Sequence, residues 1–350
     1  MSDPSPRAPE LAVIVAAYRR REYVRGALDS VLAQTLPAGS LEVLVQTDFE
    51  DVELDRHCAE VGAAHRVDAE PVIGRFLLHA IDATHAPLIA IVDDDDLVEP
   101  ERFARALDRF HRTPATTLYR NRVSVIDPVG RPVPVDRYSR LERAAGYDRT
   151  GPIEIGPGDR APGLARLRAS QGEFFNISSM VFRREIFTPL VRPEVERAIC
   201  QDLFTFVAAA TMPGSMYFDD ARLTRYRHHP TSASRLKTWR RLHWQDHLRF
   251  AAFARVHGPP ALADWLDERA RMLGCVAEAG ELLDPIRSGA APRETLGAVR
   301  RYLGRRIREP VLQPPTLVRW GSGAAATAYA LAPGLSRRFL ARVGTRLDLP

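Results

Sequence analysis

The chain has 350 residues, of which 45% are hydrophobic and 27% charged, and its net charge is +5. This composition is ordinary for a globular protein. The length allows one large domain with an appendage, or two domains. Its cysteines are few and odd in number (Cys58, Cys200 and Cys275), which argues against a disulfide framework and for a reducing compartment. The polar, proline-rich start is unlike a signal peptide, and no apolar run approaches the roughly 20 residues of a membrane span, so we expect a soluble, cytoplasmic protein.

Residues 1–10 are expected to be disordered, and the first regular element follows them directly. Residues 11–18, LAVIVAAY, form a nearly continuous apolar run, which is typical of a strand covered on both faces. Val24, Leu28 and Val31 then recur at spacings of four and three, which predicts a helix that ends near Gln34.

Two further apolar runs predict buried strands, LEVLVQTD at 41–48 and PLIAIV at 87–92. After the second, Pro100 is expected to open a helix that carries Phe103, Leu107 and Phe110 on one face. Strands that alternate with helices indicate an α/β domain with a parallel sheet and right-handed crossovers.

The pattern fails between residues 130 and 163, which are dense in Gly, Pro and charge and are expected to form a long excursion. Strand-like segments return at 178–184 and 215–229, and from residue 236 to 308 the composition favours helix.

The charge is distributed unevenly along the chain. From residue 235 to the end, 20 Lys and Arg stand against 10 Asp and Glu, a net of +10, so the remainder carries −5. We interpret the basic region as a solvated, arginine-rich helical surface; contact with an anionic acceptor or peripheral contact with a membrane surface is the alternative. A nucleic-acid platform is not expected, since aromatic residues are not interleaved with the arginines.

Acidic residues follow two of the predicted strands. Asp48, Glu50 and Asp51 come after the second strand, and Asp93–Asp96 come after the run at 87–92. Ligands of open α/β sheets bind at the carboxyl ends of the strands, and carboxylates suit Mg²⁺ or Mn²⁺. A divalent ion that bridges a diphosphate would balance the four aspartates, whereas a simple helix N-terminus would account for two acids better than for four.

Several segments, in this order, resemble one family. They are VIVAAYRRREYVRGALDSVLAQTL, LEVLVQTD, PLIAIVDDDDLVEPERFARAL, SSMVFRREIF, CQDLFTF and YRHHPTSAS, and together they span roughly residues 10–235. The chain thus resembles the family 2 glycosyltransferases, which are inverting nucleotide-sugar enzymes with the GT-A fold. The resemblance implies a GT-A domain over 11–235 with a Rossmann-like sheet, and leaves 236–350 as a mainly helical C-terminal region.

The resemblance also implies roles for individual residues. The nucleotide base, expected to be uracil, would lie against Tyr18 and the adjacent main chain, and Asp48 would accept a base N–H. In the family an acid usually precedes this aspartate, and Thr47 replaces it here. The donor-binding residues implied are Ala16, Ala17, Tyr18, Arg19, Asp48, Arg75, Asp93, Asp94 and Asp95, where Arg75 is a substitute for a missing Arg-Asn pair. The metal ligands implied are Asp95, Asp93 and His229.

Asp202 takes the place of the catalytic base, with Gln201 replacing the glutamate that usually precedes it. Asp202 would deprotonate the hydroxyl or amine of a small-molecule, glycan or lipid-linked acceptor, and a nearby cation should keep it ionised. The alternative is that Asp202 is a helix N-cap. Two other functions stay open: a nucleotidyltransferase on the same fold, although no glycine-rich loop follows the first strand, and a non-catalytic protein that binds nucleotide sugars or polyanions.

Overall fold

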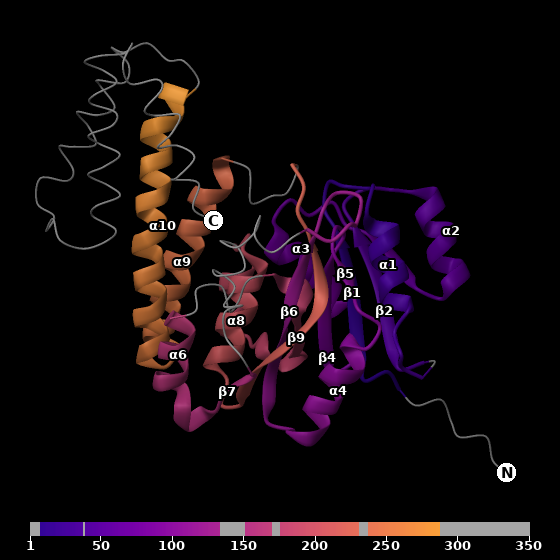
Figure 1. Ribbon diagram of the computed structural model, residues 1–350, viewed down its shortest axis with the longest axis horizontal. Coiled ribbons are helices and arrows are strands. Elements are labelled where there is room, and N and C mark those ends of the chain that lie inside the picture. The colour runs from indigo at the N-terminus through magenta and orange to yellow at the C-terminus, as the bar shows by residue number, and fades with distance from the viewer. Residues whose placement is uncertain (1–7, 38, 134–150, 170–175, 231–236, 288–350) are drawn as a thin grey trace, which may run out of the picture. The chain divides into compact units, whose positions relative to one another are not determined.

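The computed structural model describes residues 8–37, 39–133, 151–169, 176–230 and 237–287 (Figure 1). These residues form two compact units. The first contains the chain up to residue 230 together with 249–265, and the second contains 237–248 and 266–287.

A single mixed sheet runs through the first unit, in the order β3-β2-β1-β4-β8-β6-β9-β5, with β7 paired to β9. The strands are β1 (Leu11–Ala17), β2 (Leu41–Thr47), β3 (Ala64–Val67), β4 (Leu88–Asp93), β5 (Leu97–Val98), β6 (Thr116–Ile126), β7 (Ile153–Ile155), β8 (Met180–Arg183) and β9 (Ser215–Arg227). The prediction of an α/β domain is confirmed.

The prediction of a parallel sheet is right for one half only. Strands β3, β2, β1 and β4 are parallel, but β8 runs antiparallel to both β4 and β6. Strand β9 is parallel to β6 and antiparallel to β5 and β7. The strands that run against the others are therefore β5, β7 and β8, and β8 inserts between β4 and β6.

The helices of the described residues are α1 (Val24–Leu32), α2 (Val52–Val61), α3 (Ile73–Asp82), α4 (Arg102–Arg112), α6 (Arg160–Ala169), α7 (Arg192–Val195), α8 (Gln201–Thr211), α9 (Lys237–His257) and α10 (Pro260–Arg287). Helix α4 begins two residues after Pro100. The predicted excursion at 130–163 contains β7 and the start of α6, while 134–150 lie outside the described residues. The helical prediction for 236–308 holds as far as α10 extends, and residues 288–308 likewise lie outside the described part. None of the described helices has an apolar stretch long enough to cross a bilayer.

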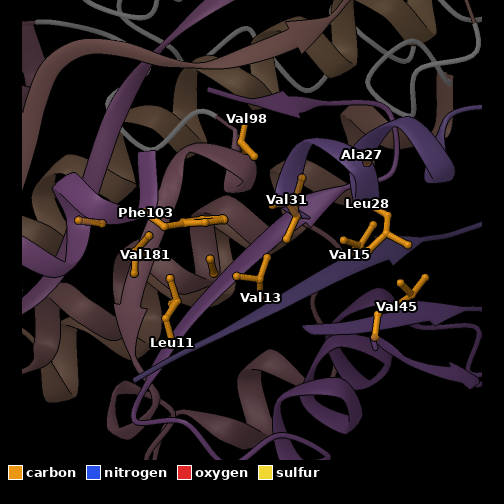
Figure 2. Close-up of a cluster of buried hydrophobic side chains, with 14 of the residues drawn as sticks. Leu11, Val13, Val15, Ala27, Leu28, Val31, Val45, Val98, Phe103 and Val181 are labelled. Carbon is orange, nitrogen blue, oxygen red and sulfur yellow. The ribbon is translucent and has the colours of Figure 1, made fainter. Parts of the chain in front are cut away.

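The hydrophobic core explains why the sequence forms these elements. All seven residues of β1 are buried, as a strand covered on both faces requires. Alternate residues of β1 pack with the apolar faces of α1 and α4, as Figure 2 shows for part of the cluster. The members from these three elements are Leu11, Val13, Val15, Ala17, Val24, Ala27, Leu28, Val31, Phe103, Ala106, Leu107 and Phe110. The core thus fixes the carboxyl end of β1, where the candidate site begins.

Gly74 provides a test of the packing beside this site. It lies in α3, and its N–H donates to the carbonyl of Ala198 at 2.9 Å. A Cβ at this position would lie 1.8 Å from the carbonyl oxygen of Val195, so backbone would have to move. We predict that Gly74→Ala lowers the free energy of unfolding by about 1–3 kcal/mol, as overpacking usually does.

Urea denaturation measures this change, and Gly26→Ala is the matched control. Gly26 is an exposed residue of α1 whose added Cβ would meet nothing closer than 3.9 Å. Because alanine favours a helix over glycine, this control should be more stable than the parent by about 0.5–1 kcal/mol. Equal stability of the two variants would contradict the packing described for α3.

Candidate active site

The carboxyl ends of three parallel strands meet at one edge of the sheet. Strands β1, β2 and β4 end at Ala17, Thr47 and Asp93, and Ala16 pairs with Gln46 on one side and with Asp93 on the other. The residues expected at the nucleotide base and those expected at the diphosphate therefore lie on neighbouring strand ends.

The residues predicted for the base pocket contact one another. The N–H of Arg19 donates to Asp48 Oδ1 at 2.8 Å, and Arg19 adopts a left-handed φ of 62°, a conformation unusual outside glycine. The Tyr18 hydroxyl donates to the carbonyl of Pro71 at 2.8 Å, while its ring packs edge-on against Phe76 with centroids 5.6 Å apart. Tyr18 is thus part of the packing and also borders the end of β1.

Arg75 reaches the same segment from α3. Its Nη2 donates to Glu70 Oε1 at 2.7 Å, and Glu70 precedes Pro71, whose carbonyl accepts the Tyr18 hydroxyl. Arg75 and Tyr18 therefore both contact the segment Glu70–Pro71. In this arrangement its guanidinium is paired with Glu70.

The aspartates after β4 form the second half of the site. One carboxylate oxygen from each of Asp93, Asp95 and Asp96 lies within 4.8 Å of the other two. We call these three residues and Asp94 the acidic cluster. Three converging carboxylates are the donor set that Mg²⁺ and Mn²⁺ prefer. Of the metal ligands implied by the sequence, Asp93 and Asp95 belong to this group, and Asp96 is an additional member.

His229 borders the acidic cluster. Its Nε2 lies 2.8 Å from Asp95 Oδ2, and the residue is only 2% exposed. Its position after β9 brings it to Asp95, as the sequence analysis implied for a metal ligand. Its role as a ligand stays a prediction.

Asp96 is held by three hydrogen bonds from two other segments. Its Oδ2 accepts from Asn176 Nδ2 and from Ser178 Oγ, each at 2.6 Å, and its Oδ1 accepts from the N–H of Arg227 at 2.9 Å. The N–H of Asp93 donates to the same Ser178 Oγ at 3.0 Å. These contacts fix two of the acids relative to each other before any ligand arrives.

The protein supplies a counter-charge of its own, which the sequence analysis did not expect. Arg20 donates through Nε and Nη2 to the two carboxylate oxygens of Asp94, at 2.9 and 2.6 Å, and Nη2 also lies 2.7 Å from Asp95 Oδ2. The only signal in the sequence was the run of three arginines, 19–21, directly after the first predicted strand.

One cation does not neutralise four carboxylates. Burial, together with repulsion from the neighbouring acids, raises the pKa of Asp93 well above its ordinary value and raises the pKa of Asp96 to about 7. The pKa of Asp94 is raised to about 6 by burial, although its hydrogen bonds with Arg20 act in the opposite direction. The acidic cluster therefore favours a further positive charge.

Asp202 lies in the first turn of α8 and is not its N-cap, a position that Cys200 takes. Asp202 Oδ1 accepts from the N–H of Leu203 at 2.9 Å and from Cys200 Sγ at 3.0 Å, and Oδ2 accepts from the N–H of Asn176 at 3.3 Å. The sequence analysis expected a nearby cation to keep this carboxyl ionised. In the protein alone, burial raises the pKa of Asp202 and the hydrogen bonds offset this only in part, so the effect of a bound cation stays a prediction.

Two residues connect Asp202 to the acidic cluster. Gln201 Nε2 donates to Asp93 Oδ1 at 2.6 Å, and Asn176 donates its side-chain amide to Asp96 and its main-chain N–H to Asp202. Asn176 has a left-handed φ of 71° and is buried. It lies outside every motif that the sequence analysis used, so no pattern pointed to it.

Comparison with known families decides the class of protein. The family described as glycosyltransferase like family 2 matches residues 8–246, which is more than half of the chain. The chain belongs to this family. Membership supports a glycosyltransferase activity for it. None of the curated proteins matches the chain.

Solved structures agree on the fold of this glycosyltransferase like family 2 chain. S. aureus TarS 1-349 in complex with UDP is 14% identical, with a TM-score of 0.53 over 92% of this chain and 91% of that one. The complex of TarS 1-349 with UDP-GlcNAc is 13% identical, with a TM-score of 0.52 over 91% and 81%. A longer TarS structure is 14% identical with a TM-score of 0.51; the match covers 93% of this chain but only 53% of that one. These similarities confirm the GT-A fold.

The raised pKa values give a testable pH dependence. An unfolded aspartate titrates near 4, so between about pH 4 and pH 7 the folded chain binds protons that the unfolded chain has lost. The contribution of Asp94 and Asp96 to stability is therefore present at low pH and is lost as the pH rises through about 6 to 7. We predict that Asp96→Asn gains stability relative to the parent between pH 5 and pH 8 in a metal-chelating buffer.

The measurement is urea denaturation of both proteins at the two pH values. Comparing the variant with the parent cancels the titration of all other groups. A stability difference that does not change with pH would show that Asp96 is ionised throughout this range.

Proposed function

We propose that the chain is a metal-dependent, inverting glycosyltransferase that moves a sugar from a nucleotide-diphosphate sugar to an acceptor hydroxyl or amine. The observation that carries this proposal is the convergence of Asp93, Asp95 and Asp96 two hydrogen bonds away from Asp202. The donor site and the catalytic base would thus be linked by the hydrogen bonds of Gln201 and Asn176. We infer that residues 11–235 form the catalytic domain, in keeping with the extent of the family match.

The donor would bind across the ends of β1, β2 and β4. Tyr18 and the main chain of Ala16, Ala17 and Arg19 would line the base pocket, and Asp48 would accept a base N–H. UDP is the nucleotide we favour, and the similar TarS structures with UDP and UDP-GlcNAc support this choice.

Mg²⁺ or Mn²⁺ would be held by Asp93, Asp95 and His229, with Asp96 beside them. A divalent cation bound there would balance the charge of the leaving diphosphate. Ser178 ties Asp96 to the main chain of Asp93. Arg75 lies on the base-pocket side, where it could exchange Glu70 for a phosphate or the base.

Asp202 would take the proton from the acceptor as the acceptor attacks the anomeric carbon from the face opposite the diphosphate. A single displacement of this kind inverts the configuration. The raised pKa of Asp202 suits this role, because a general base is most effective when its pKa approaches the working pH. The hydrogen bonds from Cys200 and Asn176 orient the carboxylate.

The donor, the metal and the acceptor are the partners that this function requires. The acceptor class, whether small molecule, glycan or lipid-linked, stays open in the proposal. Contact of the basic C-terminal region with a membrane surface stays a prediction, since most of that region lies outside the described residues. The cytoplasmic location stays a prediction from the cysteine usage.

Asp202→Asn tests the proposal, because it preserves the shape of the side chain and removes the base. We predict that sugar transfer falls by about 10²–10⁴-fold, the usual contribution of general-base catalysis. Donor affinity should change little, because the acidic cluster and the base pocket are untouched. Transfer is measured by release of the nucleoside diphosphate, and donor affinity by calorimetry.

Asp264→Asn is the control, because it also replaces a helical aspartate by asparagine but lies outside the proposed site. Asp264 is in the part of α10 that belongs to the first unit. Transfer by Asp202→Asn at the parental rate would show that Asp202 has only a structural role. Loss of donor binding in this variant would assign Asp202 to the donor site instead.

A further inference from the structure

Arg20 is the residue of the site whose contacts the proposed function does not use. It lies three residues after the end of β1, and only 18% of its side chain is exposed. Its Nε and Nη2 bind both oxygens of Asp94 in the two-pronged geometry that makes arginine–carboxylate pairs strong. Asp94 is the one member of the acidic cluster that does not belong to the converging group of three.

The same guanidinium also reaches two of the predicted metal ligands. Nη2 lies 2.7 Å from Asp95 Oδ2, and Nη1 lies 3.0 Å from His229 Nε2. His229 Nε2 is itself 2.8 Å from Asp95 Oδ2. A cation that bound Asp95 Oδ2 and His229 Nε2 would have to take the place that Arg20 occupies beside these two atoms.

We propose that Arg20 is the internal counter-cation of the acidic cluster. The pair with Asp94 anchors the Arg20 guanidinium, which stays in contact with Asp95 and His229 until a divalent cation enters together with the donor diphosphate. This inference rests on the proposed metal-dependent function. Arg20 is a positioning residue in this scheme, and it makes metal binding depend on the nucleotide.

The consequence is a coupling between two ligands. Without nucleotide, Arg20 competes for Asp95, so the protein should bind Mn²⁺ weakly. With a diphosphate present, the guanidinium can turn toward phosphate oxygens, a partner that arginine binds well, while Asp94 keeps it at the site. Each ligand then strengthens the binding of the other by the same factor.

Arg20→Gln removes the competitor. We expect the Mn²⁺ dissociation constant of the nucleotide-free, full-length protein to fall by about 10-fold or more, the worth of one hydrogen bond to a charged group. Addition of UDP should tighten Mn²⁺ binding much less in the variant than in the parent. Free Mn²⁺ is measured by electron paramagnetic resonance, so the readout needs no sugar transfer.

Arg21→Gln is the matched control, since it removes the same charge from the next residue. The side chain of Arg21 is 58% exposed and its closest carboxylate, that of Asp51, is 3.7 Å away. Its Mn²⁺ affinity should equal that of the parent. Arg20→Lys keeps a charge without the two-pronged contact and should lie between Arg20→Gln and the parent, which provides a second test if Arg20→Gln does not fold.

Two results would overturn the inference in different ways. If Arg20→Gln, or Arg20→Lys in its place, binds Mn²⁺ with the parental affinity or more weakly, Arg20 does not compete for the cluster, and the proposed function is unaffected. If neither the parent nor the variants bind Mn²⁺ even with UDP present, the metal-dependent function fails and the inference fails with it.

Discussion

Four adjacent carboxylates at the end of a buried strand are the constraint on which the rest of the site depends. Strand β4 carries them into a place with little solvent, where their mutual repulsion and the loss of hydration raise the pKa of Asp93, Asp94 and Asp96. The chain compensates from several directions: Arg20 arrives after β1, Ser178 precedes β8, and the main chain of Arg227 ends β9. The order of the sheet brings these distant segments together.

This compensation also joins the donor side of the site to the acceptor side. Gln201 and Asn176 each contact one acid of the cluster, and each lies beside Asp202 in the chain or bonds to it directly. A change in the charge of the cluster would therefore act on the orientation of the proposed base. Asn176 has a φ of 71°, which costs free energy for a residue other than glycine. Such backbone strain is often found at functional sites.

Sequence patterns predicted the elements that follow simple rules and missed those that break them. Strands β1 and β4 are nearly continuous apolar runs, β2 carries a shorter apolar stretch, and the acids after β4 indicated the site. Strand β6 escaped prediction because Arg120 and Arg122 interrupt its pattern, although Arg120 is buried. The antiparallel strands β5, β7 and β8 and the contacts of Arg20 depend on long-range pairing, which local periodicity does not encode. Asn176 is defined only by its contacts.

In the proposed function, the acidic cluster binds a diphosphate through a divalent cation. The most direct measurement compares, by titration calorimetry, the affinity of the protein for UDP and for UMP with Mn²⁺ and with a chelator. We predict that Mn²⁺ strengthens the binding of UDP far more than that of UMP, and that Asp95→Ala abolishes the difference, since Asp95 belongs to the converging group. An affinity for UDP that is the same with Mn²⁺ and with the chelator would contradict the account.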